Sequence, residues 1–115
     1  MRREWRLRHR ADFQRVRQDG RTLRQHPLMV SLTTNPTGQN RYGFIVSKQI
    51  GNAVTRNRVR RRLREVIRQL HPQLKHGFDV VFIARAGIAE QPFADVQRIV
   101  IELTRRANLL QESIS

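Results

Sequence analysis

The clearest pattern along the chain is an apolar stripe with helical spacing between residues 55 and 70. Five apolar residues recur at offsets of 4, 7, 8 and 11, which places them on one face of a helix: Val59, Leu63, Val66, Ile67 and Leu70. Pro72 follows the last of them and cannot continue the helix. We therefore predict a helix from Thr55 to Leu70 whose stripe faces the core.

Helices are also predicted near both ends of the chain. Residues 11–18 place Phe13 and Val16 three apart, and Gly20 follows as a helix-terminating residue. Residues 92–110 begin with a proline, which suits the first turn of a helix. An apolar stripe at helical spacing follows: Phe93, Val96, Ile99, Val100, Leu103, Ala107 and Leu110.

Three apolar stretches predict strands. Residues 28–34 and 41–47 flank the turn-forming residues 35–40, a pattern typical of a hairpin with a long loop. Residues 80–84 are apolar without a break, which is typical of a strand buried on both faces. The predicted order is helix, two strands, helix, strand, helix, which is an α/β (α+β) sandwich with helices packed on a small sheet.

Length and composition limit the class of protein. A chain of 115 residues fits a single domain, 1–115, and needs no disulfide or metal to fold. It contains no cysteine, and its longest apolar run is far shorter than the ~20 residues that cross a bilayer. Its basic N-terminus lacks the apolar stretch of a secretory signal. We therefore expect a cytoplasmic protein with no membrane partner.

The charge of the chain points to a polyanionic partner. Lys and Arg number 23 against 9 Asp and Glu, a formal net charge of +14, and all but Lys48 and Lys75 of the cations are Arg. A guanidinium group presents a planar fork of donors that binds phosphate bidentately and stacks on bases. A nucleic acid is therefore favoured over an anionic membrane surface or an acidic protein.

The predicted helix at residues 55–70 concentrates this charge. Residues 56–68 contain seven Arg and only one acid, Glu65. A merely solvated face would show mixed signs and acid–base pairs four residues apart. This helix instead has like charges at that spacing, each of which costs a few tenths of a kcal/mol: Arg56/Arg60, Arg60/Arg64 and Arg64/Arg68. We interpret it as an anion-binding face.

Catalytic side chains are not evident in the sequence. The four histidines lack metal-ligand spacing, and the acids are scattered without a D-x-D pair for two-metal chemistry. Asp12, Asp19 and Asp79 are predicted in cap or turn positions, where a structural role accounts for them. The polypeptide is therefore expected to be non-catalytic on its own, without a metal or cofactor of its own.

The stretch from Ser47 to Arg61, SKQIGNAVTRNRVRR, resembles the V-S-K-K-x-G-N-A-V-x-R-N-R-x-K-R signature of the bacterial ribonuclease P protein subunit. Gln49 stands where the second Lys is common, and Arg60 stands at the usual Lys. The resemblance extends to residues 12–21, which look like the family's first helix and its exit. Residues 77–85 look like its last strand. It covers about residues 6 to 110.

The resemblance implies a more complete fold than the apolar pattern does. The family order is α-β-β-β-α-β-α, with a four-stranded sheet in a two-layer sandwich, similar to ribosomal protein S5 domain 2-like folds. The connection that contains the arginine-rich helix is a rare left-handed crossover, whereas such connections are usually right-handed. The sheet therefore contains one strand that the apolar pattern misses. Residues 1–6 are expected to form a flexible basic tail, and the sequence leaves open whether Trp5 docks on the domain or lies free.

The resemblance also implies a function. Family members bind a large catalytic RNA and form the endoribonuclease that removes 5′ leaders from precursor tRNAs. The RNA and its magnesium ions carry the hydrolysis, while the protein positions the leader. The expected partners are thus a catalytic RNA subunit and precursor tRNA, with no protein partner. The alternatives are a structural RNA-binding protein of ribosomal type and a protein that reads duplex DNA with a helix in the major groove.

Site residues follow from the resemblance and from the helical wheel. The residues expected to bind the RNA subunit match the arginine-rich signature or lie one turn beyond it: Arg56, Asn57, Arg58, Arg60, Arg61 and Arg64. The residues expected to border the leader cleft, between the first helix and the sheet, are Phe13, Arg17, Ser47 and Lys48. The alternative for Phe13 is a plain core residue. Arg17 and Ser31 stand where many members carry aromatics, so we expect leader stacking to be less aromatic here.

The helical wheel predicts two separable kinds of variant. Replacing Arg60 and Arg64 together with Ala should weaken RNA binding and flatten its salt dependence, because fewer counterions are released, with little loss of fold stability. Leu63→Ala should destabilise the fold by ~2–5 kcal/mol, as a buried large-to-small change does. Salt titrations and thermal melts check both, and equal melting losses in the two variants would contradict the wheel.

Overall fold

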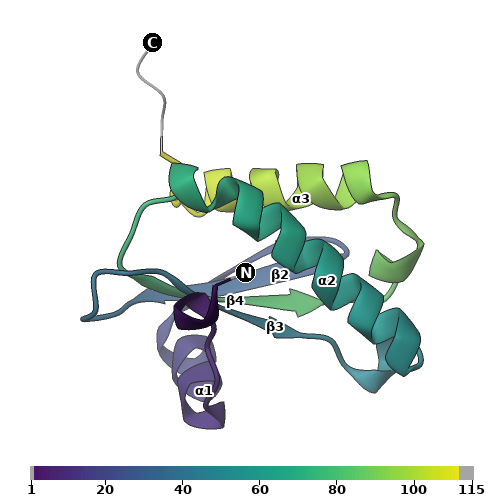
Figure 1. Ribbon diagram of the computed structural model, residues 1–115, viewed down its shortest axis with the longest axis horizontal. Coiled ribbons are helices and arrows are strands. Elements are labelled where there is room, and N and C mark those ends of the chain that lie inside the picture. Colours follow the sequence, from purple (N-terminus) through teal and green to yellow (C-terminus); the bar gives the residue numbers. More distant parts are fainter. Residues whose placement is uncertain (1, 112–115) are drawn as a thin grey trace.

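The computed structural model describes residues 2–111 and contains a four-stranded sheet with helices on both faces (Figure 1). Its main elements are α1 (Arg10–Asp19), β1 (Arg21–Gln25), β2 (Leu28–Thr34), β3 (Arg41–Ile45), α2 (Ala53–Leu70), β4 (Phe78–Ala84) and α3 (Phe93–Arg106). Helices α2 and α3 form a layer on one face, and the short α1 lies on the other. The mixed α+β class and the order implied by the resemblance are confirmed.

Strand β4 lies inside the sheet, whose order is β1-β2-β4-β3. It pairs antiparallel with β2 and parallel with β3. The predicted hairpin between residues 28–34 and 41–47 is therefore wrong, because β4 separates these two strands. The reason is the composition of β4: its residues from 79 to 84 are all buried, so it needs a neighbour on each side as well as cover on each face.

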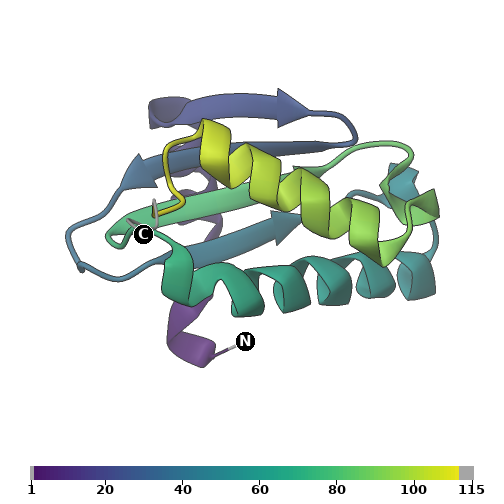
Figure 2. The ribbon, with the colours of Figure 1, turned by 90° about the horizontal axis from the view of Figure 1, so that it is seen from above.

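The connection from β3 through α2 to β4 joins two adjacent parallel strands. Figure 2 views the sheet from the side that α2 and α3 cover, with both strands running in the same direction. When these strands are turned to point upward in that view, β4 lies to the left of β3 and α2 lies in front. This is the left-handed crossover that the resemblance implied.

Strand β1 is the strand that the apolar pattern misses. Leu23 is its single apolar residue, since an edge strand paired on one side only does not need an apolar run. It forms a hairpin with β2 through His26 and Pro27.

Helix α2 begins at Ala53, two residues before the predicted start. The Asn52 side chain caps it by accepting a hydrogen bond from the Thr55 amide at 2.9 Å.

The core on the α2–α3 side contains the whole predicted stripe. All five apolar residues predicted for α2 are buried, and they pack with the inner residues of α3 and of the sheet. The stripe of α3 continues past the end of the helix at Arg106, where Asn108 turns the chain with a φ of 59°. Leu110 then pairs with Leu74 rather than extending the helix.

The N-terminal segment, described from residue 2 onward, contacts the domain through Trp5 and Arg6. Arg3–Trp5 forms a short 3-10 helix, and Arg6 forms a parallel bridge with Tyr42 at the free edge of β3. The ring of Trp5 stacks on His71 with 3.6 Å between centroids. Of the two possibilities that the sequence leaves open for Trp5, the structure shows the docked one.

A buried carboxylate holds α1 on the sheet. The side chain of Asp79 is fully buried and accepts two hydrogen bonds of 2.8 Å from Arg41 on β3 and one of 2.9 Å from Asn35. It also forms an ion pair with Arg15 of α1. Asp79 lies in β4 and not in a turn as predicted, so its partners come from three separate segments of the chain.

The hydrogen bonds and burial of Asp79 determine the direction in which its pKa is shifted. Burial acts to raise the pKa of Asp79, but the hydrogen bonds from Arg41, Asn35 and Arg15 outweigh it and hold the pKa below its ordinary value. The ion pair is therefore formed at neutral pH.

The ring of Phe13 packs directly on the backbone of β3. A Cβ added at Gly43 would collide with the ring carbons of Phe13. The ring also contacts a small apolar cluster on this face of the sheet, which consists of Leu7, Val16, Val81 and Ile83. Gly43 therefore permits the close approach of α1 to the sheet.

We predict that Asp79→Asn lowers the free energy of unfolding by about 1.5–3 kcal/mol at pH 7, because charge-assisted hydrogen bonds to two guanidinium groups are lost. Since the folded-state pKa is lowered, this contribution is present above the ordinary carboxyl value of 3.8 and is lost as the pH falls through the folded-state value. Urea unfolding of both proteins from pH 7 to acid measures it. Asp19→Asn at an exposed carboxylate is the control, and a gap that widens in acid would contradict the assignment.

We also predict that Gly43→Ala costs about 1–3 kcal/mol of stability, because the new methyl group displaces the ring of Phe13. In a Phe13→Ala background the same change should cost much less, since the colliding ring is gone. Urea unfolding of the four proteins gives the coupling, expected between about 0.5 and 3 kcal/mol. Additive costs would show that Gly43 and Phe13 do not constrain each other.

Candidate RNA-binding surfaces

Four arginines of α2 donate to backbone carbonyls beside the helix, one of them Arg60, which reaches the Val46 carbonyl at 3.4 Å. Arg56 donates to the Gly51 carbonyl at 2.9 Å, Arg58 to Ala89 at 3.5 Å and Arg62 to Gln91 at 3.2 Å. All four are half-buried. Arg56 and Arg58, both predicted to bind the RNA subunit, thus also tie α2 to the turn before it and to the segment that leads into α3.

Arg60 and Arg64 lie one turn apart on the side of α2 that faces β3 and α1. Both line a small hollow whose other side is formed by Phe13 and Gly43. Arg60 also donates to the Asn57 side chain at 3.1 Å. The structure therefore brings Phe13, predicted for the leader, next to two arginines predicted for the RNA subunit.

The outer side of α2 presents the remaining predicted residues to solvent. Asn57 and Arg61 are exposed. Arg68 is exposed as well, but it pairs with Glu65 at 2.7 Å, and this pairing lowers the pKa of Glu65. Glu65, the one acid of α2, thus pairs in the C-terminal half of the helix. Among residues 2–111, Arg61 forms no ion pair.

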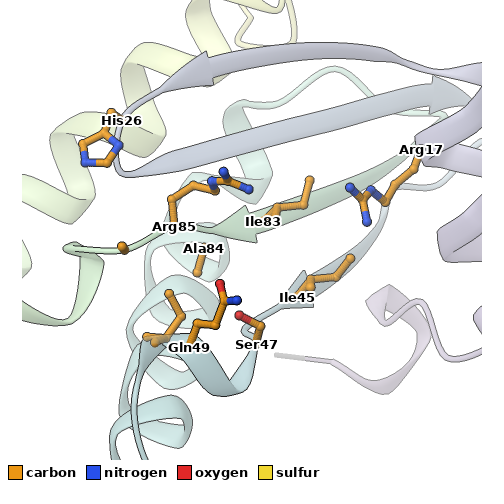
Figure 3. Close-up of a pocket in the computed structure, with 10 residues that line it drawn as sticks. Arg17, His26, Ile45, Ser47, Gln49, Ile83, Ala84 and Arg85 are labelled. Carbon is orange, nitrogen blue, oxygen red and sulfur yellow. The ribbon is translucent and has the colours of Figure 1, made fainter.

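A second concave surface lies on the α1 face of the sheet, where β3 and β4 end (Figure 3). We call it the sheet groove, and its volume is about 330 Å³. Ile45 and Ile83 form an apolar floor, and Arg17 of α1 lies at one end. Polar and cationic side chains surround the floor, so guanidinium groups can pair with the phosphates of a single strand while its bases contact the apolar floor.

Two of the four residues predicted for the leader cleft line the sheet groove. Arg17 reaches it from α1, and Ser47 borders it just after β3 (Figure 3). Lys48 is exposed beside Ser47 but does not line the groove, and Phe13 lies in the hollow below α2 instead. Ser31 is buried and shares a 2.8 Å hydrogen bond with Thr22, so it does not reach the groove.

As well as the apolar residues of its lining, three polar residues of the sheet groove were missed from the sequence: His26, Gln49 and Arg85. Arg85 had a usable signal, because it directly follows β4 just as Ser47 follows the end of β3. The carboxyl ends of parallel strands meet at one edge of a sheet, so these residues converge. No sequence signal pointed to His26, since it lies in the turn between β1 and β2, and β1 was not located from the sequence.

Two negative findings apply to the part of the chain that the structure describes. Residues 2–111 contain no group of three His, Cys, Asp or Glu side chains placed to hold a metal ion. Within the same residues, no helix is long and apolar enough to cross a membrane.

Comparison with known proteins gives one consistent answer. The family model Ribonuclease P matches residues 1–108. The ribonuclease P protein component of Roseiflexus castenholzii is 47% identical over 116 residues, covering 100% of this chain and 95% of the relative. That of Chloroflexus aurantiacus is 43% identical, covering 96% of this chain and 82% of the relative.

Solved structures agree with the sequence relatives. The RNase P protein of Staphylococcus aureus has a TM-score of 0.87 at 27% identity, covering 93% of this chain and 98% of that one. The protein from Thermotoga maritima has a TM-score of 0.81 at 30% identity, covering 88% and 96%. Together with the arginine-rich α2 and the groove beside α1, these matches show that the chain belongs to the ribonuclease P protein family, whose members are subunits of the endoribonuclease that processes tRNA 5′ ends.

Proposed function

We propose that this chain binds the catalytic RNA of ribonuclease P through α2 and the 5′ leader of precursor tRNA in the sheet groove. One observation carries the proposal: the two surfaces adjoin through a single short segment. Ser47, Gln49 and Ile50 line the groove, and the next two residues, Gly51 and Asn52, lead into α2. An RNA bound along α2 therefore lies next to the entrance of the groove.

The side chains on the two surfaces suit binding and positioning. Guanidinium groups on α2 pair with phosphates, and the apolar floor of the groove accepts the flat faces of bases beside Arg17 and Arg85. The hydrolysis itself is assigned to the RNA, with the magnesium ions that the RNA holds. The place of action that fits this role is the cytoplasm, where precursor tRNAs are made in bacteria.

The test is cleavage of a precursor tRNA by a bacterial ribonuclease P RNA at low magnesium, with and without this protein. We expect the protein to raise the cleavage rate and to lower the magnesium concentration required, because its cations offset repulsion between the two RNAs. The benefit should be larger for a precursor with a long leader than for one with a single leader nucleotide.

Variants locate the leader contact in the same assay. Arg17→Ala should reduce the difference between the two leaders, whereas Arg98→Ala, an exposed cation on α3 away from the groove, should not. No effect of the wild-type protein on cleavage would favour the structural RNA-binding alternative. Competition by duplex DNA as strong as that by structured RNA would favour the DNA-binding alternative.

A further inference from the structure

The hollow between α2 and the N-terminal segment gathers three guanidinium groups. We call it the arginine hollow; its cationic side chains are Arg6, Arg60 and Arg64, and its volume is about 100 Å³. Phe13 and Gly43 lie on its opposite side. Arg6 lies outside the arginine-rich signature, so its position beside α2 could not be predicted from that motif.

Arg6 is held in place by its neighbours on both sides. Its backbone bridges to Tyr42, and the Leu7 amide donates to the Tyr42 carbonyl at 2.9 Å. Trp5 is stacked on His71, whose ring nitrogen shares a 2.8 Å hydrogen bond with the Tyr42 hydroxyl. The N-terminal segment therefore presents Arg6 from a fixed backbone, opposite one face of α2.

The three charges repel one another, and two of them, Arg60 and Arg64, are half-buried. Burial, and then the nearby charges of Arg6 and Arg60, lower the pKa of Arg64. The Arg64 Nε–H is buried without a hydrogen-bond partner. None of the three arginines takes part in an ion pair within residues 2–111, where the acids near them pair elsewhere. A fold that holds like charges together in this way gains from a bound anion.

We propose that Arg6, Arg60 and Arg64 together hold one phosphodiester group of RNA in the arginine hollow. A phosphodiester carries its charge on two oxygens, which guanidinium forks from two sides can share. Its attached nucleoside can lie against the ring of Phe13, which borders the hollow. This inference rests on the proposed function and deepens it: the hollow lies between α2 and α1, so the phosphate belongs either to the catalytic RNA or to the leader.

A double-mutant cycle tests the shared phosphate. Arg6→Gln, Arg64→Gln and the double variant are compared with the wild-type protein in two assays. One measures affinity for ribonuclease P RNA alone, and the other measures the preference of the holoenzyme for precursor over mature tRNA. The matched control is Arg3→Gln, which removes one exposed charge from the same N-terminal segment outside the hollow.

Arg6→Gln should weaken one of the two affinities by about 10-fold, the equivalent of a charge-assisted hydrogen bond, and Arg3→Gln should weaken it far less. The loss in the double variant should be clearly smaller than the product of the single losses. Arg6→Lys should restore only part of the affinity, because it keeps the charge but not the fork. The assay that responds identifies the source of the phosphate, the catalytic RNA or the leader.

Two results would overturn the inference. In the first, Arg6→Gln behaves like Arg3→Gln in both assays; in the second, the losses from Arg6 and Arg64 multiply independently. Thermal melts of each variant ensure that the affinities refer to folded protein. The failure of the proposed function is a different outcome, because in that case the wild-type protein itself neither binds the RNA nor promotes cleavage.

Discussion

The buried carboxylate of Asp79 is the interaction on which the arrangement of both candidate RNA-binding surfaces depends. It lies at the start of the central strand β4 and joins α1, β3 and the β2–β3 loop through Arg15, Arg41 and Asn35. A ten-residue helix is marginal by itself, so α1 needs such an anchor. With α1 fixed, Phe13 reaches the arginine hollow and Arg17 reaches the sheet groove.

The chain tolerates its large positive charge by giving many guanidinium groups neutral partners. Arg56, Arg58 and Arg62 donate to backbone carbonyls, and Arg21 and Arg106 do the same on the other side of the molecule. These hydrogen bonds hold the guanidinium groups along the surface and provide donors for backbone carbonyls of neighbouring segments. They leave the charge itself uncompensated, so the folded protein remains electrostatically suited to a polyanion.

The sequence predicted features that depend on spacing within one helix. It did not predict features that depend on contacts between segments remote in the chain. The stripe of α2 was predicted in full, because helical spacing alone selects one face. Asp79 was misplaced in a turn, since its three partners are remote in sequence. The hairpin was wrong for the same reason, because β4 enters between two strands that precede it. Of the candidate leader residues, Arg17 and Ser47 meet in the sheet groove, whereas Phe13 and Lys48 do not join them there.

The placement of Phe13 changes how the two surfaces relate to each other. Sequence alone assigned the arginines of α2 to one RNA and the region around Phe13 to another. In the fold, Gly43 lets the Phe13 ring lie on β3, directly opposite Arg60 and Arg64. The arginine hollow therefore lies on one side of β3 and the sheet groove at its end, with α2 and α1 bordering them. On the proposed assignments, an RNA in the hollow would border the leader in the sheet groove, and β3 would couple the two binding events.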